Sequence, residues 1–208
     1  MILIASPCGY VINRNFIECR EDVITELRKK YQVLSKLYQG VSISLNRNEA
    51  ILDAYHNPSI EWLVFIDTDM EFGISDIELL FSNGGDVVTG VCKNIDKEYC
   101  LYDFNNVTGS IDRVTGLRKT VDICGGAFFA IRRNVVQRLC DQITINSFWG
   151  NVNVRDLQIN YPFNLVTGDN GFQYGEDVSF CLRLKELGIK IHVEVDAKIG
   201  HEKIVCIR

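Results

Sequence analysis

Two aspartates separated by one residue follow an uninterrupted apolar run in the first third of the chain. The run is Trp62–Ile66, and Asp67 and Asp69 come directly after it, with Thr68 between them. Residues i and i+2 of an extended chain project to the same side, so both carboxylates are expected to face one pocket. Such a pair is repulsive unless a cation lies with it, and oxygen ligands suit Mg²⁺ or Mn²⁺. A solvated turn can carry the same residues, so the pattern alone leaves both interpretations open.

Three further motifs contain residue types that can do chemistry. Gly125 and Gly126 precede an apolar segment, Glu176 and Asp177 open an expected helix, and His201 follows a glycine near the end. Each also has a purely structural interpretation, since paired glycines allow close backbone approach and carboxylates offset the dipole at a helix N-terminus. The functional interpretation makes one of the two acids a general base.

The elements that must position these residues alternate between strand and helix signals. We expect strands at residues 2–5, 32–38, 62–66, 86–92, 127–131 and 189–195, and helices at residues 16–30, 46–56, 75–83, 134–140 and 176–187. The third helix is expected to open with a capping box from Ser75 to Glu78. Residues 99–120 are turn-rich and indicate hairpins, and residues 142–173 a long polar loop. This order predicts an α/β fold, with a mostly parallel central sheet flanked by helices and a small antiparallel annex.

Composition limits the class of protein. The chain has 208 residues, 47% of them hydrophobic, and a net charge of −5, which is typical of a globular protein and argues against nucleic-acid binding. A phosphate ligand remains compatible, because a bound cation can supply positive charge. No apolar stretch approaches the length of a membrane span. The eight cysteines are scattered without a C-x-x-C pair, so we expect reduced core residues and a cytoplasmic location.

Taken in order, these motifs resemble the GT-A (Rossmann-like) fold of nucleotide-sugar glycosyltransferases. The resemblance rests on the strand ending in Asp-x-Asp, Gly-Gly-x-Phe-Phe-x-Ile-Arg from Gly125, Gly-Glu-Asp-x-x-Phe-Cys-x-Arg from Gly175, and the late Gly-His. Residues 44–50 and 86–91 are similar to segments of that family, so the likeness covers nearly the whole chain. The compact form is similar to capsid-glycosylating enzymes of large DNA viruses, which would place the protein in the host cytoplasm. The implied organisation is one domain, residues 1–208, with a nucleotide-binding half (1–95) and an acceptor-binding half (96–208).

The resemblance also implies roles for individual residues. Asp69 would bind the metal directly, Asp67 would contact the donor ribose or a metal-bound water, and His201 would complete the ligands or touch the diphosphate. The other donor-binding residues would be Ser6, Pro7, Cys8, Gly9, Tyr10, Arg47 and Thr68. The sugar and acceptor would lie against Gly125, Gly126 and Trp149. Glu176 and Asp177 match the acidic pair of the family, and Asp177 is the better candidate for the base if the reaction inverts configuration.

The implied function is Mn²⁺- or Mg²⁺-dependent transfer of a sugar from a nucleoside-diphosphate sugar to a hydroxyl of a glycan or glycoprotein. Uridine diphosphate (UDP) is the expected carrier. Two alternatives remain open: a sugar nucleotidyltransferase, and a non-catalytic module that binds nucleotide sugars or carbohydrate within a longer protein. A dehydrogenase is disfavoured because no G-x-G-x-x-G follows a strand.

Overall fold

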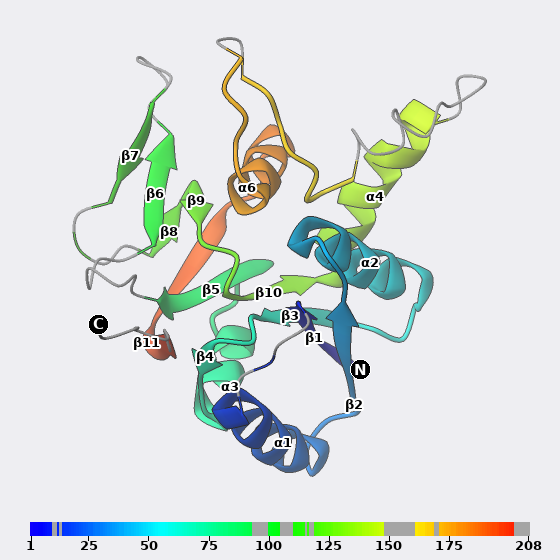
Figure 1. The fold of residues 1–208 in the computed structure, drawn as a ribbon, viewed down its shortest axis with the longest axis vertical. Coiled ribbons are helices and arrows are strands. Elements are labelled where there is room, and N and C mark those ends of the chain that lie inside the picture. The colour runs from blue at the N-terminus through cyan, green and yellow to red at the C-terminus, as the bar shows by residue number, and fades with distance from the viewer. Residues whose placement is uncertain are drawn as a thin grey trace.

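The computed structural model describes residues 1–9, 12, 14–92, 100–104, 110–114, 116, 119–147, 161–168 and 171–201, with the backbone alone for residues 142–147. Within these residues an eight-stranded sheet has the order β2-β1-β3-β10-β5-β11-β4, and β8 also pairs with β11. A smaller three-stranded sheet, β7-β6-β9, stands beside it (Figure 1).

The described elements are bounded as follows. The strands of the large sheet are β1 (Ile2–Cys8), β2 (Val33–Gln39), β3 (Trp62–Ile66), β4 (Met70–Glu71), β5 (Val87–Cys92), β8 (Thr120–Val121), β10 (Phe128–Arg132) and β11 (Ile191–His201). Those of the small sheet are β6 (Leu101–Phe104), β7 (Ile111–Arg113) and β9 (Ile123–Cys124). The helices are α1 (Arg14–Arg28), α2 (Ile43–His56), α3 (Ile74–Ser82), α4 (Arg133–Ser147) and α6 (Glu176–Glu186).

The central sheet is mostly parallel, as predicted. Strands β2, β1 and β3 run the same way, and β11 runs parallel to β5. Between the two groups lies β10, which is antiparallel to both β3 and β5. The two groups therefore point in the same direction, and their carboxyl ends share one edge, which is where open α/β sheets bind ligands.

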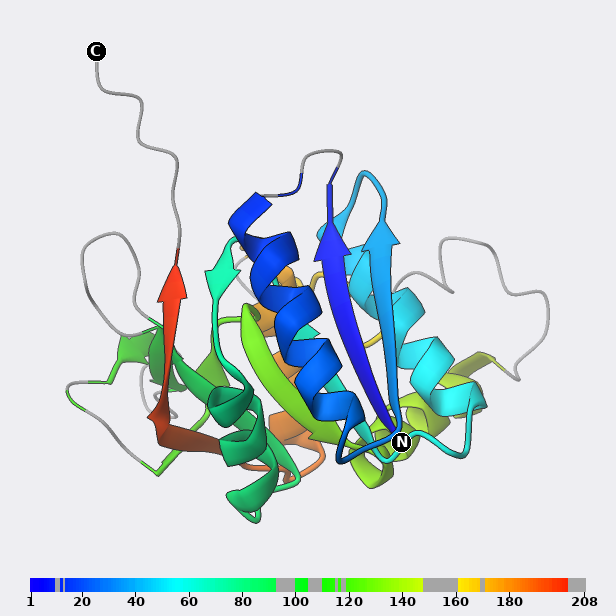
Figure 2. The same cartoon turned by 90° about the horizontal axis from the view of Figure 1, so that it is seen from below.

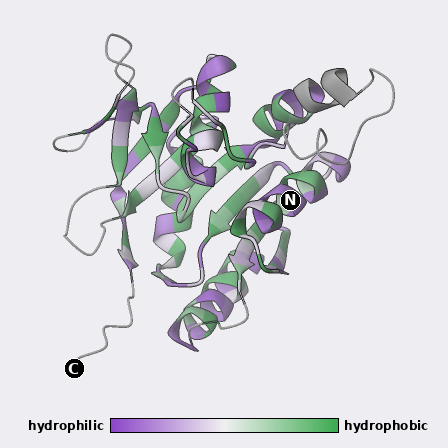
Figure 3. Ribbon diagram, turned by 45° about the horizontal axis from the view of Figure 1, so that its top comes forward, coloured by the Kyte–Doolittle hydropathy of each residue, from purple (hydrophilic) through white to green (hydrophobic). Residues whose placement is uncertain are grey.

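Helices cover both faces of this sheet, which explains the continuous apolar runs in its strands. In β3, Leu63 and Phe65 pack with residues of α2, α4 and α6, whereas Trp62, Val64 and Ile66 pack with α1 and α3. Figure 2 shows α1 and α3 lying across the second face. Coloured by hydropathy, the central strands are largely apolar, and the helices mix apolar and polar residues (Figure 3).

Four local predictions were wrong at their boundaries. Helix α4 does not end at Cys140 but continues to Ser147, into the segment predicted as a loop from residue 142. β1 does not end at Ala5 but continues to Cys8, because its pairing with β2 extends through Cys8 after its pairing with β3 has stopped at Ala5. Helix α3 is capped at Gly73, whose N–H donates to Asp76 at 2.7 Å, and not by Ser75 with Glu78.

The final strand is longer than predicted and reaches His201. Glu194 pairs with Gly90 and Lys198 with Val91, so the register shifts by three residues between them. After this bulge the strand also pairs with β4, where His201 lies opposite Met70.

No disulfide joins the cysteines of the described residues. Among the described helices, none combines the length and apolar character required to cross a bilayer.

Candidate functional site

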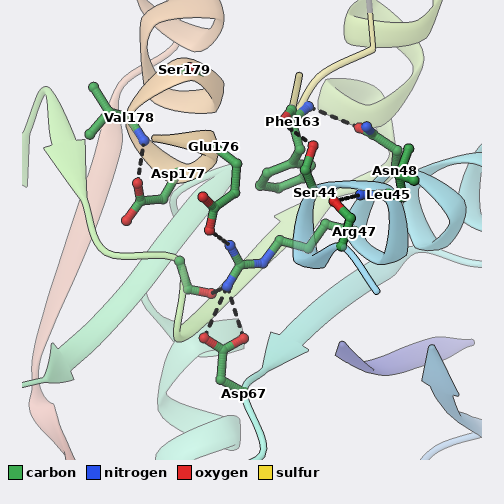
Figure 4. Close-up of polar contacts among 12 residues, drawn as sticks. Ser44, Leu45, Arg47, Asn48, Asp67, Phe163, Glu176, Asp177, Val178 and Ser179 are labelled. Carbon is green, nitrogen blue, oxygen red and sulfur yellow. Dashed lines mark hydrogen bonds and ion pairs between the residues drawn. The ribbon is translucent and has the colours of Figure 1, made fainter. Parts of the chain in front are cut away.

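The centre of the site is a buried arginine on α2. Arg47 is 2% exposed, its Nη2 lies 2.9 and 3.0 Å from the two carboxylate oxygens of Asp67, and its Nη1 lies 2.8 Å from Oε1 of Glu176 (Figure 4). Nη2 also donates to the carbonyl of Gly126 at 3.0 Å. One guanidinium therefore joins the end of β3, the glycine segment before β10 and the first residue of α6.

Burial and pairing oppose each other at these groups. Burial lowers the pKa of Arg47, but Asp67 and Glu176 outweigh it and the net shift is upward. Burial also raises the pKa of Asp67, and the guanidinium opposes that rise. Because a guanidinium keeps its proton at any ordinary pH, and because it contacts both carboxylate oxygens, we describe Arg47 and Asp67 as an ion pair.

The absence of a side chain at Gly126 makes room for this arginine. A Cβ at Gly126 would lie 2.7 Å from Nη1 and 2.8 Å from Cζ of Arg47, well inside van der Waals contact. At Gly125 a Cβ would meet only the Cβ of Cys100, at 3.3 Å. The sequence predicted that a ligand lies beside these glycines. In the structure, the group that approaches Gly126 closely is the side chain of Arg47.

The second cluster pairs Asp69 with His201. Nε2 of His201 lies 2.9 Å from Oδ2 of Asp69, although the two residues are 132 positions apart in the chain. The ladder between β4 and β11 brings them together, since Met70 and His201 are partners in it. The exposed fractions are 47% for the Asp69 side chain and 19% for the His201 side chain, so the pair is open to solvent.

Asp67 therefore belongs to the cluster around Arg47, whereas Asp69 pairs with His201. Among the described residues, no group of three or more His, Cys, Asp or Glu side chains is arranged to hold a metal ion. Asp69 and His201 supply one oxygen and one nitrogen donor. This is compatible with Mg²⁺ or Mn²⁺, which commonly bind through one or two carboxylates and take water and substrate phosphate for the rest.

The two acids of α6 have different surroundings. Glu176 pairs with Arg47, whereas Asp177 accepts the N–H of Val178 at 2.7 Å (Figure 4). Burial raises the pKa of the Asp177 carboxyl above its ordinary value, while bonds from the N–H groups of Val178 and Gly126 partly oppose the shift. A carboxylate with a raised pKa is a stronger base than an exposed one.

The predicted donor segment lies at the carboxyl end of β1. Ser6 is fully buried, and its Oγ has no hydrogen-bond partner among the described residues. The carbonyl of Cys8 accepts from Nδ2 of Asn46 at 3.0 Å, which attaches the end of β1 to α2. A Cβ at Gly9 would meet nothing within 4 Å, so there is open space beside it. Two predicted contact residues, Tyr10 and Trp149, lie outside the described residues.

Sequence reasoning missed the two asparagines on either side of Arg47. Asn46 holds β1, and Asn48 accepts the N–H of Phe163 at 2.9 Å and donates to Oδ1 of Asn164 at 2.9 Å. The ring of Phe163 stacks on Phe180 of α6, with centroids 4.4 Å apart. The signal in the sequence was a run of three consecutive polar residues within one expected helix. The structure shows that all three are buried.

No protein-family model matches this chain, and a search of curated proteins gave no match. Solved structures do match. A197 from STIV is 17% identical with a TM-score of 0.56, and the match covers 100% of this chain and 96% of that one. GalNAc-T7, solved with UDP, GalNAc and Mn²⁺, is 13% identical with a TM-score of 0.53, and the match covers 98% of this chain and 43% of that one.

A Drosophila β1,4-galactosyltransferase 7 mutant, in complex with manganese, UDP-Gal and xylobiose, is 9% identical over 98% of this chain and 72% of that one. Its TM-score of 0.48 is too low to support an argument. The likeness to GalNAc-T7, together with the mixed α/β architecture, identifies a GT-A fold. At such identities the likeness concerns the fold alone.

Proposed function

We propose that this protein is a metal-dependent glycosyltransferase. It would transfer a sugar from a nucleoside-diphosphate sugar, expected to be UDP-linked, to a hydroxyl of a glycan or glycoprotein. The observation that carries the proposal is the contact between Asp69 and His201, 2.9 Å apart at the carboxyl edge of a GT-A sheet. A carboxylate shortly after the buried central strand β3 and an imidazole from the last described strand lie in contact there, which supports the proposal.

The proposed metal ligands are Asp69 and His201, with Asp67 at a metal-bound water or the donor ribose. A divalent cation at this position would offset the negative charge that develops on the departing diphosphate. Ser6, Pro7, Cys8, Gly9, Tyr10 and Thr68 are the proposed donor contacts. The open space beside Gly9 supports a ligand at this end of β1.

Asp177 is proposed to act on the acceptor. Its carboxylate would take the proton of the acceptor hydroxyl, the acceptor oxygen would bond to the anomeric carbon, and the bond from that carbon to the phosphate oxygen would break with its electron pair left on the diphosphate. The raised pKa of Asp177 supports the assignment. Gly125, Gly126 and Trp149 would border the sugar and acceptor.

The proposed halves, residues 1–95 and 96–208, would each contribute to both clusters. Asp69 and Arg47 come from the first half, and His201 and Glu176 from the second. A glycan or glycoprotein acceptor follows from the resemblance to capsid-glycosylating viral enzymes, which stays a prediction.

A thermal-shift panel of nucleotide sugars, run with Mn²⁺ and with a chelator, tests this function. A ligand at a hundred times its dissociation constant should raise the melting temperature by roughly 5–10 °C. We expect that shift for one or more UDP-sugars with Mn²⁺ only, and release of UDP in a turnover assay. If no nucleotide sugar shifts the melting temperature, the proposal is wrong. Pyrophosphate released from a nucleoside triphosphate would favour a nucleotidyltransferase, and metal-independent binding without turnover would favour a binding module.

A further inference from the structure

The contacts of Arg47 connect residues that the proposed function assigns to different substrates. Asp67 belongs to the proposed donor and metal site, and Glu176 adjoins the proposed base on α6. Arg47 bonds to both, over sequence separations of 20 and 129 residues, and to the Gly126 carbonyl between them. In Figure 4 the guanidinium lies between the two carboxylates.

We propose that Arg47 is a positioning residue that couples the donor side of the site to the acceptor side, and that it does not contact the donor. This inference rests on the proposed glycosyltransferase function. A side chain that is 2% exposed, with both terminal nitrogens bonded to the protein, offers almost no surface to a ligand.

The helix that carries Arg47 is fixed on both sides of it. Asn46 bonds to the end of β1, and Asn48 bonds to Phe163, whose ring lies 5.6 Å from Cζ of Arg47 and stacks on α6. Because α2 is fixed in this way, the guanidinium cannot move toward one carboxylate without breaking its bond to the other. Its attraction is therefore shared between Asp67 and Glu176.

Because Arg47 is shared between Asp67 and Glu176, we expect a change at Glu176 to affect the proposed metal site through the arginine. If Glu176 loses its charge, Asp67 becomes the only carboxylate bound to the guanidinium. Arg47 then binds Asp67 more tightly, so the Asp67 carboxylate is less available to a cation or a metal-bound water. Glu176 should therefore influence metal binding even though it is not a proposed ligand. A lysine cannot transmit the effect, because its ammonium is a single point and lacks the fork that reaches two carboxylates.

The experiment measures the Mn²⁺ concentration that gives half-maximal UDP binding, by calorimetry, in four proteins: the parent chain, Glu176→Gln, Arg47→Lys and the double variant. In the parent background, Glu176→Gln should raise this concentration about three- to tenfold, which lies in the lower part of the range of coupling between contacting residues. In the Arg47→Lys background the same change should alter it by less than about twofold.

Arg133→Lys is the matched control. Like Arg47, Arg133 is bound through its guanidinium to several groups of the protein. It lies on α4 and donates to the backbone carbonyls of Ala54, Tyr55 and Asn57, at the C-terminal end of α2. Arg133→Lys should lower stability and leave the effect of Glu176→Gln on Mn²⁺ binding intact. If Arg47→Lys does not fold, Gly126→Ala provides a second background, because it displaces the guanidinium and keeps its charge.

The coupling is refuted if Glu176→Gln has no effect on Mn²⁺ binding in the parent chain, or the same effect in both backgrounds. In either case, UDP binding by the parent chain with Mn²⁺ would leave the proposed function standing. If the parent chain binds no UDP with Mn²⁺, the glycosyltransferase proposal fails and the coupling fails with it.

Discussion

Replacing Gly126 by alanine should destabilise the protein far more than the same change at Gly125. The new Cβ would lie 2.7–2.8 Å from three atoms of the Arg47 guanidinium, which is itself bonded to Asp67 and Glu176. Restoring ordinary contact requires the guanidinium to move by about 1 Å. At Gly125 the nearest atom is the Cβ of Cys100 at 3.3 Å, so only a small adjustment is needed.

The size of the effect follows from two costs and one gain. Overpacking costs about 1–3 kcal/mol, and a lost hydrogen bond to a charged group about 1.5–3 kcal/mol. Alanine restricts the unfolded chain, which returns about 0.4–1 kcal/mol. The free energy of unfolding should therefore fall by about 2–5 kcal/mol in Gly126→Ala, and change by less than about 1 kcal/mol in Gly125→Ala.

Urea unfolding followed by circular dichroism measures both values, and an unchanged slope with denaturant shows that stability alone has changed. The difference between the two alanine variants should shrink in an Arg47→Lys background, because the lysine has no planar group at that position. Equal stabilities of Gly126→Ala and Gly125→Ala would refute the packing of the guanidinium against this backbone. No substrate is needed, so this test is independent of the proposed function.

Three further outcomes are expected. Asp69→Ala should abolish the Mn²⁺-dependent part of UDP-sugar binding and turnover, and wild-type activity in that variant would remove the metal assignment. Asp177→Asn should fold and bind donor but transfer sugar roughly 10²–10⁴-fold more slowly. Burial raises the pKa of Asp177 in the folded state, so the ionised carboxylate destabilises the fold at neutral pH. Asp177→Asn should therefore resist urea at least as well as the parent chain. This advantage should disappear as the pH falls through the raised pKa, because the aspartate of the parent chain then becomes neutral too. Phe163→Ala should cost about 3–5 kcal/mol in urea unfolding, whereas Phe172→Ala, at a side chain 60% exposed, should change stability by less than about 0.5 kcal/mol.

The sheet was predictable because its signals are local. An uninterrupted apolar run such as Trp62–Ile66 requires burial on both faces, and the observed packing confirms that arrangement. Helices α1, α2 and α6 were predicted to within a few residues, since each places apolar side chains at helical spacing. The resemblance implied that Asp69 and His201 share a metal site; the structure places the two side chains in contact, and their metal role stays a prediction.

The role of Arg47 was not predictable in the same way. Its partners lie 20, 79 and 129 residues away, so no spacing along the chain reveals them, and an arginine in the first half of a helix is usually solvated. The two-residue strand β4 is also too short to give a pattern, yet it is the element that aligns His201 with Asp69. Both features depend on tertiary packing and not on local periodicity.

The register shift in β11 has a consequence for the imidazole. Residues 195–197 lie between partners of adjacent residues of β5, and successive side chains of a strand alternate between its faces. Deleting one of the three residues should turn His201 to the opposite face of the strand and away from Asp69. The number of residues in this short insertion therefore decides which face of the strand the imidazole of His201, the proposed nitrogen ligand, occupies.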